Sequence, residues 1–144
     1  MRAAREICAD PALALHFGEA VELGQISILG HIDHGIETMA DVFAFINHYM
    51  DLVIDTGGPS PRLLVERHRG DVWIIDRRRS PNETPELTES GFARMVCGAR
   101  RFFGEKRLLK VVHVTHAPPD YRDEYDRIFQ APVVFESHCN ALVY

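Results

Sequence analysis

Two stretches in the first third of the chain carry the signals of helices. Asp10 stands before Pro11, and proline suits the first helical position because its missing N–H would have no partner there. We therefore expect a short helix over residues 11–19. In residues 25–32 the apolar side chains are spaced slightly better for a helix than for a strand, so both readings stay open there.

A longer helix is predicted farther along. Thr38 with Asp41 resembles the capping box that begins many helices, and apolar residues then recur at intervals of three and four. These residues are Met39, Val42, Phe43, Ile46, Met50 and Val53. The spacing predicts an amphipathic helix of about four turns, and Gly57 and Gly58 end it.

The middle of the chain opens with a predicted β-hairpin. Residues 62–68 and 72–76 are rich in strand-forming side chains and flank a turn at Arg69-Gly70-Asp71. The run Arg77-Arg78-Arg79 that follows is expected to lie in a solvated loop.

Thr84 before Pro85 gives a second combined signal for a helix start, and Gly104 is expected to close this helix. Its buried side is predicted to carry Leu87, Met95, Ala99, Phe102 and Phe103.

The last third alternates strand and helix patterns. Residues 108–114 have few polar interruptions, which predicts a strand in the interior of the sheet. Pro118-Pro119-Asp120 begins a short helix, and residues 133–135 and 140–144 read as two strands joined in a hairpin by a polar turn at 136–138. The helix should place one aromatic and apolar face inward, made of Tyr121, Tyr125, Ile128 and Phe129.

This order of elements predicts the fold class. Strands joined partly by hairpins and partly through helices give an α+β domain, here with N-terminal helices packed on a largely antiparallel sheet. No repeat or linker divides the sequence, so residues 1–144 are expected to form a single domain.

Charge and cysteine content narrow the classes of function. The net charge of the 144 residues is −5, whereas a domain that binds DNA by itself usually has a basic surface. The three cysteines, Cys8, Cys97 and Cys139, are far apart and odd in number, which argues against disulfides and indicates the cytoplasm. No signal peptide and no membrane-spanning run of about 18 apolar residues occurs, so no membrane partner is expected.

Histidines are the candidate metal ligands. His31 and His34 share a face if they lie on a helix, but His113 and His116 would point to opposite faces of a strand. No H-E-x-x-H or Cys-pair motif completes a ligand set, so no metal and no cofactor is expected. Catalytic motifs are also absent. The alternatives that stay open are a small acid–base or metal-assisted enzyme, in which Asp33 would act with a histidine, and a dimerisation module without a ligand.

A pocket is the feature on which a binding function would depend. Helices packed on a curved sheet can leave an apolar cavity with a few polar groups. Tyr49, Trp73, His113 and His31 combine an apolar body with a polar tip, and we name them as candidate ligand-binding residues. Each could instead be a core residue with its polar tip satisfied.

The C-terminal residues carry a family pattern. His116-Ala117-Pro118 is followed by Tyr125 and Phe129, then by Pro132-Val133-x-Phe135, and finally by Asn140-x-Leu142-x-Tyr144. This pattern resembles the arabinose-binding-like N-terminal domain of AraC-type bacterial transcription regulators. Gly30, the helix start at 38–41 and Tyr49 agree more loosely. Gln130-Ala131 and Glu136 depart from the pattern, at positions that are expected to shape turns.

The resemblance implies a function. It implies a domain that senses a small-molecule effector, can dimerise, is not an enzyme, and contacts DNA only through two helix-turn-helix units in a C-terminal part that is missing here. The sequence stops inside an apolar strand at Leu142-Val143-Tyr144, which also leads us to expect a continuation. The resemblance does not assign ligand-binding residues.

Overall fold

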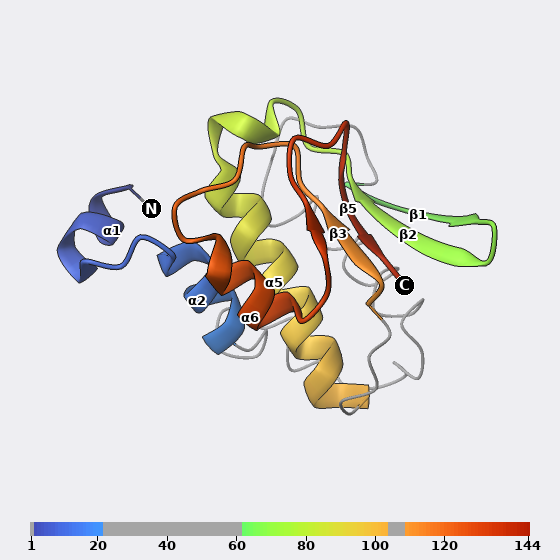
Figure 1. Cartoon of the computed structure of the whole chain (residues 1–144), viewed down its shortest axis with the longest axis horizontal. Coiled ribbons are helices and arrows are strands. Elements are labelled where there is room, and N and C mark those ends of the chain that lie inside the picture. Colours follow the sequence, from blue (N-terminus) through green and yellow to red (C-terminus); the bar gives the residue numbers. More distant parts are fainter. Residues whose placement is uncertain (1, 22–61, 104–108) are drawn as a thin grey trace.

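A computed structural model of the chain describes residues 2–21, 62–103 and 109–144. The predictions for residues 25–32, for the helix after Thr38, for Tyr49 and His31, and for Gly104 lie outside these ranges. Within them, α2, α5 and α6 gather on one side of a sheet, and the β1–β2 hairpin projects beyond it (Figure 1).

The elements follow the predicted sequence order closely. They are α1 (Arg2–Cys8), α2 (Leu13–Ala20), β1 (Leu63–His68), β2 (Asp71–Asp76), a 3-10 turn η2 (Pro81–Glu83), α5 (Pro85–Phe103), β3 (Val111–His113), α6 (Arg122–Phe129), β4 (Val133–Val134) and β5 (Asn140–Val143).

Of the two combined helix-start signals, one lies at a helix start and the other just before one, because the helix expected from residue 11 begins at Leu13 with Ala12 as its N-cap. The Asp10 carboxylate accepts the N–H of Ala12 at 3.0 Å, and α2 becomes helical from Leu13. The second helix, α5, begins at Pro85 as predicted.

The described strands form one five-stranded sheet in the order β1-β2-β5-β3-β4. The β1–β2, β2–β5 and β5–β3 pairs are antiparallel and the β3–β4 pair is parallel. The prediction of an α+β domain with a largely antiparallel sheet is therefore confirmed, and so is the interior position of β3.

The predicted C-terminal hairpin is wrong. β4 pairs in parallel with β3, to which α6 returns the chain, and β5 lies between β2 and β3. The backbone N–H of Ser137 donates to the carbonyl of Val114 as the chain passes the end of β3. All four residues of β5 are buried. In the observed position β5 is paired with β2 and β3, which suits a strand whose four residues are all buried.

Side chains alternate between the two faces of the sheet. Leu63, Ile74, Val112 and Leu142 point to the side of α2, α5 and α6 and belong to the core, and we call this side the helical face. The opposite side, which we call the second face, carries Trp73, Ile75, His113, Ala141 and Val143.

The buried side of α5 differs from the predicted one. Leu87 is 43% exposed, while the neighbouring Thr88 and Glu89 are buried. The inward stripe continues with Phe92, Ala93, Val96 and Cys97. The prediction failed at Leu87 because it selected apolar residues, whereas two polar residues with hydrogen-bond partners occupy the inward positions.

A glycine allows α2 to approach α5. A Cβ at Gly18 would collide with the backbone carbonyl of Ser90 and would lie 2.8 Å from the Cβ of Ala93. Gly18 is itself buried. The absence of a side chain at this position therefore sets how closely the two helices pack.

The positions that depart from the family pattern lie in turns, as predicted. Gln130 ends α6 with φ 51° and Glu136 follows Phe135 with φ 53°, both in the left-handed region that favours glycine. The β1–β2 turn at Arg69-Gly70 also has positive φ at both residues, which matches the right-handed twist of a hairpin.

Candidate functional site

The second face carries a pair of stacked rings. The centroids of Trp73 and His113 lie 5.2 Å apart, with 23° between the ring planes. Trp73 is on β2 and His113 on β3, with β5 between them. Ala141 of β5 is the register partner of His113. Its small side chain leaves room for the two rings to meet above the central strand.

The surroundings of His113 favour the neutral form of its imidazole. Burial lowers the pKa of His113 below its ordinary value of 6.5, and the charge of the nearby His138 lowers this pKa further. Its Nδ1 lies 3.2 Å from the hydroxyl of Ser137. At neutral pH this imidazole is therefore a neutral ring that can donate one hydrogen bond and accept another.

A hollow of about 520 Å³ adjoins the stacked pair, which is within the size range of small-molecule sites. Its walls come from the hairpin and from the residues just before β5: residues 66–68, Trp73, Ile75, His138 and Cys139. Burial raises the pKa of the Cys139 thiol, so this wall offers no thiolate nucleophile.

The structure brings together two of the four residues named from sequence, Trp73 and His113. Tyr49 and His31 lie outside the described residues. Sequence reasoning missed His138 and Cys139, because it assigned the segment around them to a polar turn. No local pattern in the sequence shows that these two residues line a hollow.

A second polar group lies on the helical face, around Glu89, which is 2% exposed. The hydroxyls of Tyr121 and Tyr125 donate to its Oε1 at 2.8 and 2.6 Å, and His116 Nε2 lies 3.1 Å from the Tyr125 hydroxyl. Burial, followed by the charge of Glu89, raises the pKa of both tyrosines. Among the described residues, Glu89 Oε2 has no hydrogen-bond partner.

The residues that carry the family pattern gather around this group. The ring of Tyr125 lies 5.1 Å from Phe135, 5.8 Å from Phe129 and 6.0 Å from His116. The buried Asn140 accepts the backbone N–H of Thr115 at 2.8 Å, which joins the end of β3 to β5. The pattern therefore marks a packed cluster that holds the fold together.

The arginine run has a structural role in its centre. Arg78 is only 7% exposed, so the prediction of a solvated loop is wrong at this residue. Its guanidinium donates to the carbonyls of Pro81 and Thr84 and to the Thr88 hydroxyl, at 3.1, 3.1 and 2.8 Å. These bonds give hydrogen-bond partners to two backbone carbonyls just before α5, in a region that is largely shielded from solvent.

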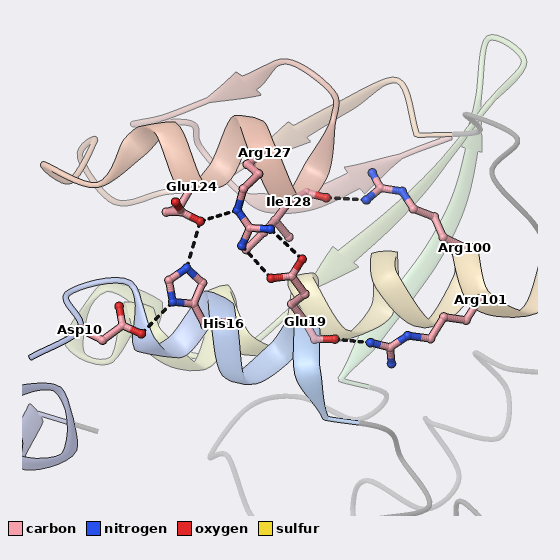
Figure 2. A network of polar contacts seen from close by, with 8 residues as sticks. All are labelled: Asp10, His16, Glu19, Arg100, Arg101, Glu124, Arg127 and Ile128. Carbon is pink, nitrogen blue, oxygen red and sulfur yellow. Dashed lines mark hydrogen bonds and ion pairs between the residues drawn. The ribbon is translucent and has the colours of Figure 1, made fainter. Parts of the chain in front are cut away.

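A charged network joins α2 to α6 (Figure 2). His16 of α2 contacts the carboxylates of Asp10 and Glu124, and Arg127 contacts both Glu124 and Glu19. These contacts lower the pKa values of Glu19 and Glu124. The bond from Arg127 has the largest effect on Glu19, and the bond from His16 has the largest effect on Glu124.

Two arginines of α5 complete the network at the helix ends. Arg100 donates to the carbonyls of Ile128 and Phe129 at the end of α6, and Arg101 donates to the carbonyl of Glu19 at the end of α2. Cationic donors suit these positions because the last carbonyls of a helix lack partners within it.

Among the residues that the structure describes, no three or more His, Cys, Asp or Glu side chains are grouped so that they could hold a metal ion. In the same ranges, no helix is both long and apolar enough to cross a membrane.

Comparison with known proteins identifies the family. The family described as the N-terminal arabinose-binding domain of AraC transcription regulators matches residues 1–144. No curated protein matches the chain. The matched family is a regulatory sensing domain and not a family of enzymes. Because the match covers the whole sequence, the chain belongs to the family of N-terminal arabinose-binding domains of AraC transcription regulators.

Proposed function

We propose that this sensing domain binds a small-molecule effector on the second face of the sheet, against Trp73 and His113 and in the adjoining hollow. The observation that carries the proposal is the stacked pair of rings beside a hollow of about 520 Å³. An indole that lines the hollow, a neutral imidazole, and hydroxyl and charged groups nearby suit a small polar molecule with an apolar face. Tyr49 and His31 stay part of the proposed site.

The bound effector would act on DNA binding indirectly. The net charge of −5 argues against phosphate contacts by this domain. We propose that helix-turn-helix units in a further part of the regulator make those contacts, and that residues 1–144 act as one sensing unit. The effector would shift the balance between active and inactive arrangements by binding one of them more tightly, with dimerisation as one way to couple them.

Trp73 provides a direct test because it is the only tryptophan in the sequence. We would titrate the chain with L-arabinose, which the family's name suggests, then with other aldoses and small organic acids, and follow its fluorescence. A compound that binds at the site should change the Trp73 emission. Calorimetry should then show at least a roughly tenfold weaker Kd in His113→Ala, equivalent to about 1.4 kcal/mol.

Tyr121→Phe is the matched control, because it also alters a partly buried aromatic side chain but on the helical face, and it should leave the Kd unchanged. A compound that binds without changing the Trp73 emission, and with the same affinity in His113→Ala, would place the effector elsewhere.

A further inference from the structure

His16 lies between two carboxylates that come from different parts of the chain. Its Nδ1 is 2.7 Å from Asp10 Oδ2, and its Nε2 is 2.9 Å from Glu124 Oε2 (Figure 2). An ionised carboxylate can only accept hydrogen bonds, so both ring nitrogens must donate to make both contacts. Only the doubly protonated, positively charged imidazole has two N–H groups. A neutral His16 can keep one of the two bonds but not both.

The two contacts of His16 belong to a chain of alternating charges. Arg127 Nε donates to Glu124 Oε2 at 2.6 Å, and the Arg127 guanidinium pairs with both oxygens of Glu19 at 2.9 and 2.7 Å. His16 and Glu19 lie on α2, Glu124 and Arg127 lie on α6, and Asp10 precedes α2. His16 therefore joins α6 to the segment that begins α2.

We propose that His16 is a proton-dependent tie that docks the start of α2 on α6, and that docking weakens when His16 loses its proton. The strength with which the start of α2 packs on α6 would then depend on pH. It is independent of where the effector binds.

Glu19, Glu124 and Arg127 of this network keep their charge near neutral pH. The pKa values of Glu19 and Glu124 are lowered, and that of Arg127 is raised by its bonds to Glu19 and Glu124. From α5, Arg101 donates to the backbone of Glu19. The pKa of His16 itself is raised above 6.5, first by its bond to Asp10 and then by its bond to Glu124.

The direction of the pH effect follows from the raised pKa. When the folded form binds a proton more tightly than the unfolded form, the added stability is fully present below the unfolded pKa of about 6.5. It is lost as pH rises through the higher folded pKa. The tie should therefore hold in mildly acidic solution and weaken as the solution becomes alkaline.

The first test measures the titration of His16 by NMR in the whole chain, with its signal assigned from the spectrum of His16→Gln. We expect the imidazole of His16 to titrate above pH 6.5, and to move back towards 6.5 in Glu124→Gln. The deciding pKa is read from the native chain, and the two variants serve to assign the His16 signal and to measure the contribution of Glu124. A His16 pKa at or below 6.5 would overturn the proposal.

The second test compares hydrogen-exchange protection of α2 with that of α5 at pH 6 and pH 8.5, corrected for intrinsic exchange rates. Protection of α2 should fall by about twofold to fivefold in the native chain, the range for exposed ion pairs, while α5 changes less. In His16→Gln, the amides of α2 should be weakly protected at both pH values. In His16→Arg, which places a permanent cation with several hydrogen-bond donors at this position, α2 should be protected at both pH values.

His138→Gln is the control for a general effect of removing a histidine, since His138 is exposed and lines the hollow on the second face, whereas α2 packs on the helical face. It should keep the pH response of the native chain. Equal protection of α2 at both pH values in the native chain, or the same fall in His16→Gln, would show that His16 is not the tie.

Discussion

On the helical face of the sheet, Ile74, Val112 and Leu142 are buried under α2, α5 and α6, and even the polar Glu89 has two hydroxyl partners there. On the second face, Trp73 and His113 stack beside a hollow. The residues that carry the family pattern, such as Tyr125 and Phe135, lie in the packed cluster of the helical face. Family membership therefore transfers the fold, and our proposal that an effector binds against Trp73 and His113 concerns the opposite, second face.

The largest effect is expected from Gly18→Ala, which tests how tightly the helical face is packed. The added methyl group would meet the Ser90 carbonyl, and backbone cannot move away as a flexible side chain can. We expect a loss of about 2–3 kcal/mol in the free energy of unfolding, measured by urea denaturation.

The matched control is Gly98→Ala in α5, where an added Cβ meets nothing within 4 Å. Alanine should stabilise this helix by about 0.5–1 kcal/mol. If Gly18→Ala behaved like Gly98→Ala, the close approach of α2 and α5 would be refuted.

Tyr125→Phe should have the next largest effect on stability. The variant removes one of two donors to the buried Glu89 and the partner of His116 Nε2. We expect unfolding to become easier by about 1–3 kcal/mol, the usual range when a buried polar group loses its partner.

The same variant separates the two faces of the sheet. Once an effector is known, its affinity should be unchanged in Tyr125→Phe, because the lost hydroxyl faces the helices. A large loss of affinity together with unchanged stability would reverse the roles that we assign to the faces.

Gln130→Gly should be stabilising. Gln130 ends α6 with φ 51°, where a side chain is strained and glycine is not. We expect a gain of up to about 1 kcal/mol in unfolding free energy, seen as a higher Tm in calorimetry. Ala131→Gly, at a neighbouring residue without positive φ, should give no such gain.

The smallest expected effect is a contrast between two histidines. The pKa of His113 is lowered by burial, so its neutral form is favoured in the fold, and stability should fall as the pH drops below about 6.5. The contribution of His16 to stability changes with pH in the opposite direction, because its pKa is raised and the contribution is lost as pH rises. NMR titration should find His113 below 6.5 and His16 above it, and titration of both on the same side would contradict the contrast.

Local sequence signals located most of the described helices and strands to within a few residues. Thr84-Pro85 stands at the start of α5, and Asp10-Pro11 precedes α2 by a short turn in which the Asp10 carboxylate accepts the N–H of Ala12. Both signals act through the backbone of nearby residues. The hairpin turn at Arg69-Gly70 is local in the same sense. The family pattern was also readable, since its residues keep fixed spacings along one short stretch.

Which strands are neighbours depends on packing between distant segments and became known from the folded structure. The local pattern allowed a C-terminal hairpin, but β5 lies between β2 and β3, and this position brings Trp73 and His113 together above Ala141. Sequence could name both rings as candidates from their mixed polarity, yet it could not place them in contact. The burial of Glu89 and Arg78 likewise depends on partners from other segments. Pairing between distant residues is set by the packing of the whole domain, which no local spacing records.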